Sequence, residues 1–344
     1  MRSFKIEGRE IGLGRPCFII AELGYNFVDE AEMLAAIDAA ASAGCDSIKL
    51  QTFRADTVVA KGFDFPAEAG GNDQWDEFKR YEISEELHRS FFKRARARGL
   101  VPLSTPSHPD DLALLERVGS TIYKVGSDDL TNLPFIERVA KTGKPLIFSS
   151  GMAAFEEVET ALKVVRGAGN ENVVVLQCTS NYPIKDPALV NARVIGSYRE
   201  KLGVLSGYSD HTTSLVTPVV AAALGACVYE RHFTLRKDNG TPDAPFSADP
   251  AEMKALVRAL REAEAMLGDG VKKPTPTESR MRDYTRKGAV AARDLSAGEI
   301  LKSGDFAVKR PALGIPPAET AKAVGRRLKM AVKKDQPLTW GHLE

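Results

Sequence analysis

Short apolar stretches recur along this chain, and nearly every one ends in a polar or charged residue. Each stretch is short and almost continuously apolar, which is typical of strands buried on both faces of a parallel sheet. We predict eight such strands, over residues 16–22, 46–51, 100–105, 121–127, 145–150, 173–180, 203–211 and 226–232.

Segments with helical periodicity lie between these strands. Several begin at Asp, Ser or Asn and end at Gly, as capped helices do. We predict helices over residues 30–44, 84–99, 108–119, 132–143, 155–169, 214–226 and 249–268. Alternation of strand and helix predicts an α/β fold of the (β/α)8 TIM-barrel type. In that fold active sites lie where the strands end, so the polar strand ends should converge.

Two regions interrupt the alternation. Residues 61–81 are long, Gly-rich and aromatic, and they form either a lid over the barrel mouth or a surface excursion. Residues 271–287 are rich in Pro, Thr and charge, which is typical of a linker. We therefore predict a barrel over residues 1–270 and, after the linker, a small β-rich domain over residues 288–344 that leans on a partner surface.

Composition excludes several classes of protein. The 344 residues are 43% hydrophobic and 27% charged, with a formal net charge of +1. This balance predicts a globular cytoplasmic protein that binds neither nucleic acid nor membrane. The four cysteines lie in or beside apolar strands without a CxxC pair. We expect them to be buried thiols rather than a zinc site or a disulfide framework.

Two histidines follow the last two predicted strands. His211 and His232 would end adjacent barrel strands, close enough for their imidazoles to bind one ion. Imidazole suits first-row divalent metals, and Asp210, Glu230 or Asp243 could supply oxygen ligands or orient the rings. The alternative is a pair of core histidines, but the positions favour a metal site with open positions for a substrate oxygen.

Lys49 and Lys124 lie inside predicted strands. A buried ammonium must be paired or must face the barrel mouth, because an isolated buried charge is costly. The lysines could bridge internal carboxylates, or one of them could form a Schiff base. Together with the strand-end serines they favour a pocket for phosphate and carboxylate groups; these serines are Ser127, Ser149, Ser180 and Ser209. Beside such a pocket, Glu22 would transfer a proton or accept sugar hydroxyls.

The chain resembles the sialic acid synthase family, which condenses phosphoenolpyruvate with an N-acetylated amino sugar. The resemblance is carried by FIIAELGYN, AGCDSIKLQTF, GKPLIFSSGM, GYSDHT, ERHFTL and KRPALGI, among other stretches along nearly the whole chain. Pseudaminic and legionaminic acid synthases and spore coat polysaccharide proteins belong to the same group. The C-terminal part is similar to the family's antifreeze-like SAF domain.

The resemblance implies roles for individual residues. It implies Mn²⁺, with Mg²⁺ or Co²⁺ as alternatives, on His211 and His232. The implied phosphoenolpyruvate contacts are Lys49, Thr105, Lys124, Ser127, Ser149, Ser180 and Ser209. The implied catalytic residues are Glu22, Tyr182 and Asp243, which with Asp129 also face the sugar. In the family an arginine at the position of Arg310 reaches the sugar site of the other subunit, which implies a domain-swapped homodimer.

The sequence departs from the family pattern mainly on the implied sugar side. Phe27, Asp129, Ser180 and Ala244 replace the residues that are usual at those positions. The metal residues and the phosphoenolpyruvate residues other than Ser180 match, so we expect a retained reaction with an altered sugar. Two alternatives stay open: a metal-dependent or Schiff-base aldolase on the same barrel, and a non-catalytic sugar-binding relative.

Overall fold

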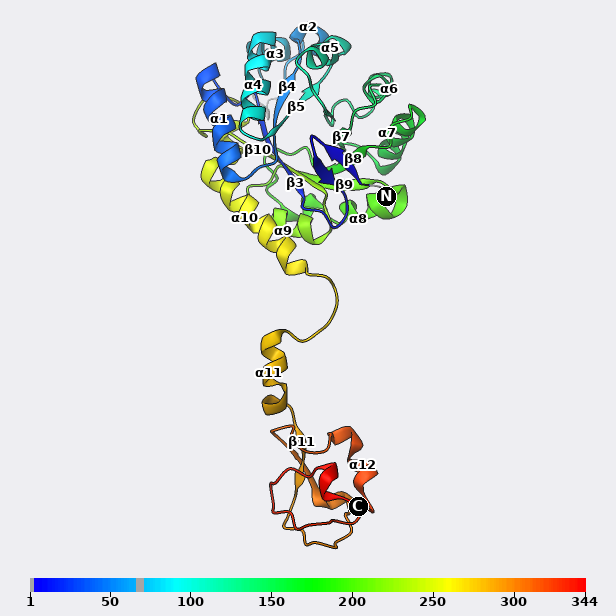
Figure 1. Ribbon diagram of the computed structural model, residues 1–344. Coiled ribbons are helices and arrows are strands. Elements are labelled where there is room, and N and C mark those ends of the chain that lie inside the picture. The colour runs from blue at the N-terminus through cyan, green and yellow to red at the C-terminus, as the bar shows by residue number, and fades with distance from the viewer. Residues whose placement is uncertain (1–2, 66–70) are drawn as a thin grey trace. The chain divides into compact units, whose positions relative to one another are not determined.

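Eight parallel strands surround one interior and are covered by helices in the N-terminal part of the chain (Figure 1). The computed structural model describes residues 3–65 and 71–344. In chain order the eight strands are β3 (Phe18–Gly24), β4 (Ser47–Thr52), β5 (Val101–Pro106), β6 (Tyr123–Val125), β7 (Leu146–Ser149), β8 (Val173–Cys178), β9 (Leu205–Asp210) and β10 (Val228–His232). Each overlaps one of the predicted strand ranges, although β3, β4 and β5 end one or two residues later than predicted. The prediction of a (β/α)8 barrel is confirmed.

Backbone pairing follows the order β5-β4-β3-β10-β9-β8-β7-β6. The first and last strands of the barrel pair directly, with His232 opposite Glu22 and Glu230 opposite Ile20. Strands β5 and β6 lie beside each other and complete the ring. A short antiparallel hairpin of β1 (Phe4–Ile6) and β2 (Arg9–Ile11) precedes it.

Helices form the outer layer of the barrel. They are α1 (Glu30–Ala43), α4 (Glu85–Ala97), α5 (Pro109–Arg117), α6 (Leu133–Ala140), α7 (Phe155–Gly167), α8 (Val194–Leu202), α9 (Val216–Ala223) and α10 (Pro250–Leu267). Side chains cap several of them, as where Asp29 accepts from the Glu32 amide, and Gly44 ends α1 at a φ of 91°. Every predicted helix is present, while α8 was not predicted.

The hydrophobic core of the barrel has two layers. The larger lies between the strands and the helices and contains residues such as Ile19, Ile48 and Leu115. The smaller contains Ile20, Leu103 and other side chains from the alternate strand positions, together with Phe4, Ile6 and Ile11 of the N-terminal hairpin. Because side chains alternate between faces along a strand, this second layer fills the barrel interior.

Residues 61–81 contain α3 (Gln74–Arg80), which follows the short helix α2 (Ala55–Val58). The Phe78 ring lies 5.0 Å from the Phe53 ring, and the Tyr81 ring stacks on Tyr25 at 4.8 Å. These contacts anchor the described part of the segment beside the ends of β3 and β4. Residues 66–70 lie outside the described part, and the role of the segment as a lid stays a prediction.

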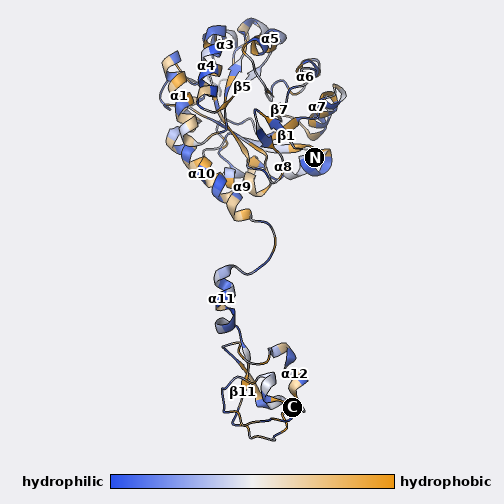
Figure 2. Ribbon diagram, viewed as in Figure 1, coloured by the Kyte–Doolittle hydropathy of each residue, from blue (hydrophilic) through white to orange (hydrophobic). Residues whose placement is uncertain are grey.

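The chain divides into two compact units, Met1–Gly268 and Asp269–Glu344. The second contains α11 (Pro276–Thr285), β11 (Gly288–Ala291), β12 (Phe306–Lys309) and α12 (Thr320–Ala323). Its own small core includes Ala289, Leu301 and Leu338. Helix α11 lies within the predicted linker and is largely hydrophilic in Figure 2, and within the described chain none of its residues is buried. No helix among the described residues is long and apolar enough to cross a membrane.

Candidate active site

The barrel interior changes from apolar to polar toward the carboxyl ends of its strands. Ile20 belongs to the interior core, and Glu22, two residues later, lies on the same face of β3. The same step from apolar to polar occurs on other strands. By this alternation the interior polar residues include Glu22, Lys49, Thr105, Lys124, Ser149, Cys178, Ser209 and Glu230. The predicted convergence of the strand ends is therefore seen for this group.

Two lysines and two glutamates form a buried ionic cluster at the polar end. Lys49 Nζ lies 2.5 Å from Glu22 Oε2 and 4.0 Å from Glu230 Oε2. Lys124 Nζ lies 3.3 Å from Glu230 Oε1. All four side chains are buried. The lysines therefore do bridge internal carboxylates, which was one of the sequence-based alternatives, and Glu230 pairs with them rather than standing free as a metal ligand.

Hydroxyl groups border this cluster. Lys49 Nζ donates to Thr105 Oγ1 at 3.1 Å, and Lys124 Nζ donates to Ser149 Oγ at 2.6 Å. Ser209 Oγ donates to Glu230 Oε1 at 2.9 Å. Ammonium groups combined with hydroxyl donors suit the recognition of carboxylate or phosphate oxygens.

The charges within the cluster are unequal. Burial raises the pKa of Glu22, and this effect outweighs the opposing attraction of Lys49. Burial alone would also raise the pKa of Glu230, but Lys124 and Lys49 lower it to about 2. Burial would lower the pKa of Lys49, yet Glu22 and Glu230 raise it above its usual value. Glu230 is thus the more acidic of the two carboxyl groups, and Glu22 is the one that takes up a proton more readily. The pKa of Lys49 favours its charged form.

A tight contact joins the ends of β6, β7 and β8. The Gly151 amide donates to Ser127 Oγ at 2.9 Å. A Cβ atom at Gly151 would lie 2.2 Å from Ser180 Oγ and 2.8 Å from Ser127 Oγ, so any larger residue there would displace at least one of these hydroxyl groups. Ser180 Oγ is buried without a hydrogen-bond partner among the described residues. Its unused hydroxyl is available to an anion or a substrate oxygen.

His211 and His232 lie together at the ends of adjacent strands, with ring centroids 5.3 Å apart. The Nδ1 atom of His211 lies 2.8 Å from the Thr179 carbonyl oxygen, so Nδ1 carries the proton and leaves Nε2 free as an acceptor. His232 Nδ1 lies 3.4 Å from Asp243 Oδ2. Burial and the neighbouring His211 lower the pKa of His232, which keeps that imidazole neutral.

These residues fit a divalent metal ion held by two imidazoles. His232 Nδ1 is buried and makes no hydrogen bond within the described residues, so a ring nitrogen is left without a partner. The described side chains include no group of three or more His, Cys, Asp and Glu arranged around one metal position. Further ligands would have to be water or substrate oxygens, which suits a site that binds substrate.

An aromatic wall borders the histidines. The Tyr182 ring lies 4.1 Å from the His211 ring and 5.5 Å from that of Phe246. Tyr182 is 52% exposed, so it can contact a ligand at the mouth. Burial, followed by the nearby charge of Glu22, raises the pKa of Asp243 to about 6. Tyr182 and Asp243 therefore lie beside the two histidines.

Three predicted residues make none of the contacts described so far, and the prediction for one of them, Asp210, needs correction. Asp210 was a candidate metal ligand, but it occupies the outer face of β9 and accepts from Arg231 at 2.9 Å, so it is not one. Asp129 follows β6 and bonds with Asn132 at 2.9 Å. Arg310 lies in the second unit directly after β12, and its role at the site stays a prediction.

The sequence analysis missed Gln51 and Cys178 as site residues. Gln51 Nε2 donates to Glu22 Oε1 at 3.0 Å, and strict alternation from Lys49 would have placed it on the interior face. Cys178 Sγ lies 3.8 Å from His211 Nδ1 and 3.7 Å from Ser127 Oγ. Burial would raise the pKa of this thiol, but His211 brings it below the usual value. Its interior position distinguishes it from an ordinary core cysteine.

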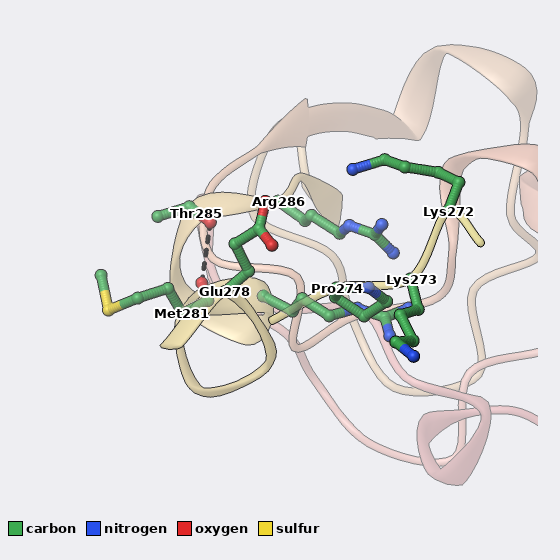
Figure 3. A pocket seen from close by; sticks show the side chains of 8 residues that line it. Lys272, Lys273, Pro274, Glu278, Met281, Thr285 and Arg286 are labelled. Carbon is green, nitrogen blue, oxygen red and sulfur yellow. Dashed lines mark hydrogen bonds between the residues drawn. The ribbon is translucent and has the colours of Figure 1, made fainter. Parts of the chain in front are cut away.

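One hollow lies beside the polar strand ends, and another lies in the second unit. One of about 380 Å³ is lined by Cys178, Ser180, Tyr198 and neighbouring residues at the ends of β7 and β8. The other, of about 440 Å³, lies at α11 in the second unit (Figure 3). Its lining includes Lys272, Glu278 and Met281 but none of the predicted site residues. The strand ends, rather than the larger hollow, therefore carry the chemistry.

Comparison with known proteins identifies the family of both parts of the chain. A model of the NeuB family matches residues 36–272, and a model of the SAF domain matches residues 286–344. The chain belongs to the NeuB family. The resemblance stated from the sequence is thereby confirmed.

Several relatives span nearly the whole NeuB-family chain. N,N'-diacetyllegionaminic acid synthase of Legionella pneumophila is 36% identical over 99% of this chain and 98% of its own. Pseudaminic acid synthase of Campylobacter jejuni is 35% identical over 95% of this chain and 96% of its own. N-acetylneuraminate-9-phosphate synthase of Homo sapiens is 34% identical, over 96% of this chain and 94% of its own.

Solved structures are similar as well. N-acetylneuraminic acid synthetase from Leptospira borgpetersenii has a TM-score of 0.74 at 28% identity, covering 81% of this chain and 94% of that one. Spore coat polysaccharide biosynthesis protein SpsE from Bacillus subtilis has a TM-score of 0.70 at 27% identity, covering 100% of this chain and 99% of that one.

Proposed function

We propose that this NeuB-family protein is a nonulosonate synthase. It would condense phosphoenolpyruvate with N-acetylmannosamine or a 2,4-diacetamido-trideoxyhexose to give a nine-carbon 2-keto-3-deoxy sugar acid and phosphate. The observation that carries the proposal is the buried Lys49–Lys124 pair beside the His211–His232 pair at one end of the barrel. The named synthases among its relatives support the same reaction.

Phosphoenolpyruvate would bind over the ionic cluster. Lys49 and Lys124 bring two ammonium groups to it, and the carboxylates beside Lys49 raise its pKa, so this lysine stays charged to bind an anion. Hydroxyl groups would complete the binding of the carboxylate and phosphate oxygens. We assign this role to Thr105, Ser127, Ser149, Ser180 and Ser209, with Gly151 keeping Ser127 and Ser180 close together.

The sugar would bind on the side of the aromatic wall. We assign its contacts to Glu22, Asp129, Tyr182 and Asp243. A divalent ion, Mn²⁺ in our proposal with Mg²⁺ or Co²⁺ as alternatives, would be held by His211 and His232 and would polarise the aldehyde of the open-chain sugar. His211 would offer its Nε2 atom, because its Nδ1 atom contacts the Thr179 carbonyl oxygen, and His232 would offer a neutral ring, because burial lowers its pKa.

The bond changes balance when one water molecule is consumed with the two substrates. C3 of phosphoenolpyruvate forms a bond to the sugar aldehyde carbon, whose oxygen takes up a proton. Positive charge then develops at C2, water adds there, and phosphate leaves as the 2-keto group forms. Glu22 would transfer the proton, because burial raises its pKa above the ordinary value of a glutamate. The anionic Glu230 would offset the charge at C2.

The raised pKa of Lys49 argues against the alternative of a Schiff-base aldolase. A Schiff-base lysine must lose its proton to attack a carbonyl group, and Glu22 and Glu230 keep Lys49 protonated. The intact ionic cluster likewise argues against a non-catalytic sugar-binding protein, because binding alone does not call for four buried charges.

We further propose a domain-swapped homodimer in which the partner subunit's Arg310 contacts the sugar. Two features favour a partner. Helix α9 exposes Val216, Val219 and Val220, with Leu215 before it, and within the described chain α11 buries none of its residues. We also propose a cytoplasmic location, since all four cysteines are free thiols, as is usual in a reducing compartment.

The test is a phosphate-release assay with manganese-loaded protein, phosphoenolpyruvate and each of the three sugars, namely N-acetylmannosamine and two diacetamido-trideoxyhexoses. We expect release of phosphate with at least one sugar. The product should have the combined mass of that sugar and pyruvic acid, with no phosphate attached. Absence of release with all three would refute this form of the proposal. Borohydride trapping of a lysine adduct with pyruvate would instead support the aldolase.

A further inference from the structure

A buried ion pair stands directly before the two histidines in the sequence. Asp210 precedes His211 at the end of β9, and Arg231 precedes His232 on β10. Arg231 Nη1 donates to Asp210 Oδ2 at 2.9 Å. We propose that Asp210 and Arg231 are positioning residues that hold His211 and His232 at the spacing a divalent ion requires. This inference depends on the metal site of the proposed function.

The backbone register places the pair where it can act on both histidines. Asp210 and Arg231 are direct Cα partners between β9 and β10, and each histidine is the next residue along its strand. The preceding partners, Ser209 and Glu230, bond to each other on the interior face at 2.9 Å. The two strands are thus clamped on both faces immediately before the histidines, which limits sliding and splaying of the strand ends.

Asp210 also fixes the turn that contains His211. Its Oδ1 atom accepts from the Thr212 amide at 2.8 Å, and its Oδ2 atom accepts from Thr212 Oγ1 at 3.3 Å. Thr212 Oγ1 lies 3.0 Å from the hydroxyl oxygen of Thr217, on α9. The carboxylate therefore holds the residues on both sides of His211, so the imidazole has little freedom to move.

Arg231 reaches the surroundings of His232. Its Nη2 atom donates to the Phe246 carbonyl oxygen at 3.5 Å, and the Phe246 ring lies 5.4 Å from the His232 ring. Through this contact Arg231 ties the segment after β10 to the strand that bears His232. The Arg231 guanidinium thereby links the Asp210 carboxylate, next to His211, to the backbone of Phe246, whose ring lies beside His232.

The burial of the pair makes these restraints strong. The Asp210 and Arg231 side chains are 0% and 5% exposed, so water cannot replace either partner. Buried ion pairs add little stability compared with apolar side chains of equal volume, but loss of one partner leaves an uncompensated charge. The pair therefore does more to define geometry than to stabilise the fold. Substitution of a residue that orients a metal ligand commonly weakens metal binding about 10- to 100-fold.

The test compares metal affinity with stability in the full-length protein. We would measure the Kd for Mn²⁺ by calorimetric titration and the Tm by thermal unfolding for Asp210→Asn and Arg231→Met. We expect the Kd for Mn²⁺ to rise about 10- to 100-fold in each variant. Thr212→Val is a milder variant that removes only hydroxyl contacts, and we expect it to raise the Kd about fivefold.

Arg261→Met is the matched control. Arg261, on α10, bonds to Asp46 at 2.8 Å and to Glu264 at 3.0 Å, beside the start of β4 rather than at the histidines. We expect this variant to lower Tm while leaving the Kd for Mn²⁺ unchanged. If Asp210→Asn lowers Tm in the same way yet binds Mn²⁺ like the wild type, the inference is overturned. Should Asp210→Asn not fold, an unchanged Kd in Thr212→Val overturns it.

A separate variant keeps this inference distinct from the proposed function. His232→Ala should lose Mn²⁺ binding if the histidines hold the ion. Unchanged binding in His232→Ala would refute the metal site itself. Loss of binding in His232→Ala, combined with wild-type binding in Asp210→Asn and Thr212→Val, would refute only the positioning role of Asp210 and Arg231.

Discussion

The ammonium of Lys124 lies 3.3 Å from the carboxylate of Glu230, and both groups are buried at the polar end of the barrel. Glu230 also lies 4.0 Å from Lys49, so one carboxylate neutralises part of two positive charges. Without substrate Glu230 stabilises the two lysines, and with an anionic substrate bound the lysines offset the negative charge of both Glu230 and the substrate. The relationship makes Glu230 a useful residue to change.

Glu230→Gln should weaken the fold and alter the pH profile. The substitution removes one partner of a buried ion pair, so we expect the free energy of unfolding to fall by about 3 kcal/mol. Glu230 is one of the groups that raise the pKa of Lys49, so the pKa of Lys49 should fall. The alkaline limb of kcat/KM should therefore move to lower pH. An unchanged alkaline limb, measured with phosphoenolpyruvate varied, would contradict this.

Acid should destabilise the wild type through the same carboxylate. Lys124 and Lys49 hold the pKa of Glu230 at about 2, below its ordinary value of 4.5. A depressed carboxyl pKa contributes stability above the unfolded pKa, and that contribution is lost as pH falls from about 4.5 toward 2. Urea unfolding across this range should show a loss in the wild type that is smaller in Glu230→Gln. Parallel curves for the two proteins would be evidence against the pairing.

The sequence predicted the barrel well because its strands are buried on both faces and therefore read as short apolar runs. Helix α8 was missed because Arg193, the residue before its first turn, makes no capping side-chain bond, and because the helix contains Gly196. Asp210 was misplaced because the run ending at His211 holds three polar residues in succession. Only the pairing of β9 with β10 reveals that Ser209 faces the interior and Asp210 the outer layer.

The contact around Gly151 could not be inferred from the sequence at all. It depends on the ends of three strands meeting, which brings Ser127 and Ser180 within reach of one backbone position. A glycine after a strand has many local explanations, and none of them names these two hydroxyl groups. Tertiary contact between distant residues decides its role.

Gly151→Ala should impair the binding of phosphoenolpyruvate. The new methyl group would lie 2.2 Å from Ser180 Oγ and 2.8 Å from Ser127 Oγ, so at least one hydroxyl must move. We expect the KM for phosphoenolpyruvate to rise about tenfold, the equivalent of about 1.4 kcal/mol, with a smaller change in the sugar KM. Gly167→Ala, at the end of α7 with no atom within 4 Å of the new Cβ, is the control and should leave both KM values unchanged.

Arg310→Ala tests the proposed contribution of the second unit. Arg310 follows β12 and belongs to the same compact unit as the SAF match. If the partner subunit's Arg310 binds the sugar, the variant should raise the sugar KM about 10- to 100-fold, since a hydrogen bond to a charged group contributes about 1.5–3 kcal/mol. The KM for phosphoenolpyruvate should stay nearly unchanged.

The matched control for Arg310 is its neighbour Lys309, which pairs with Asp335 inside the second unit. Lys309→Ala removes a positive charge one residue away, so a merely electrostatic effect of the unit should appear in both variants. A change in sugar KM confined to Arg310→Ala supports direct contact. Mixing Arg310→Ala with a barrel-site variant such as His232→Ala then decides between subunits. Because each mixed dimer would hold one site with both residues intact, partial recovery of activity supports the swapped arrangement, and no recovery contradicts it.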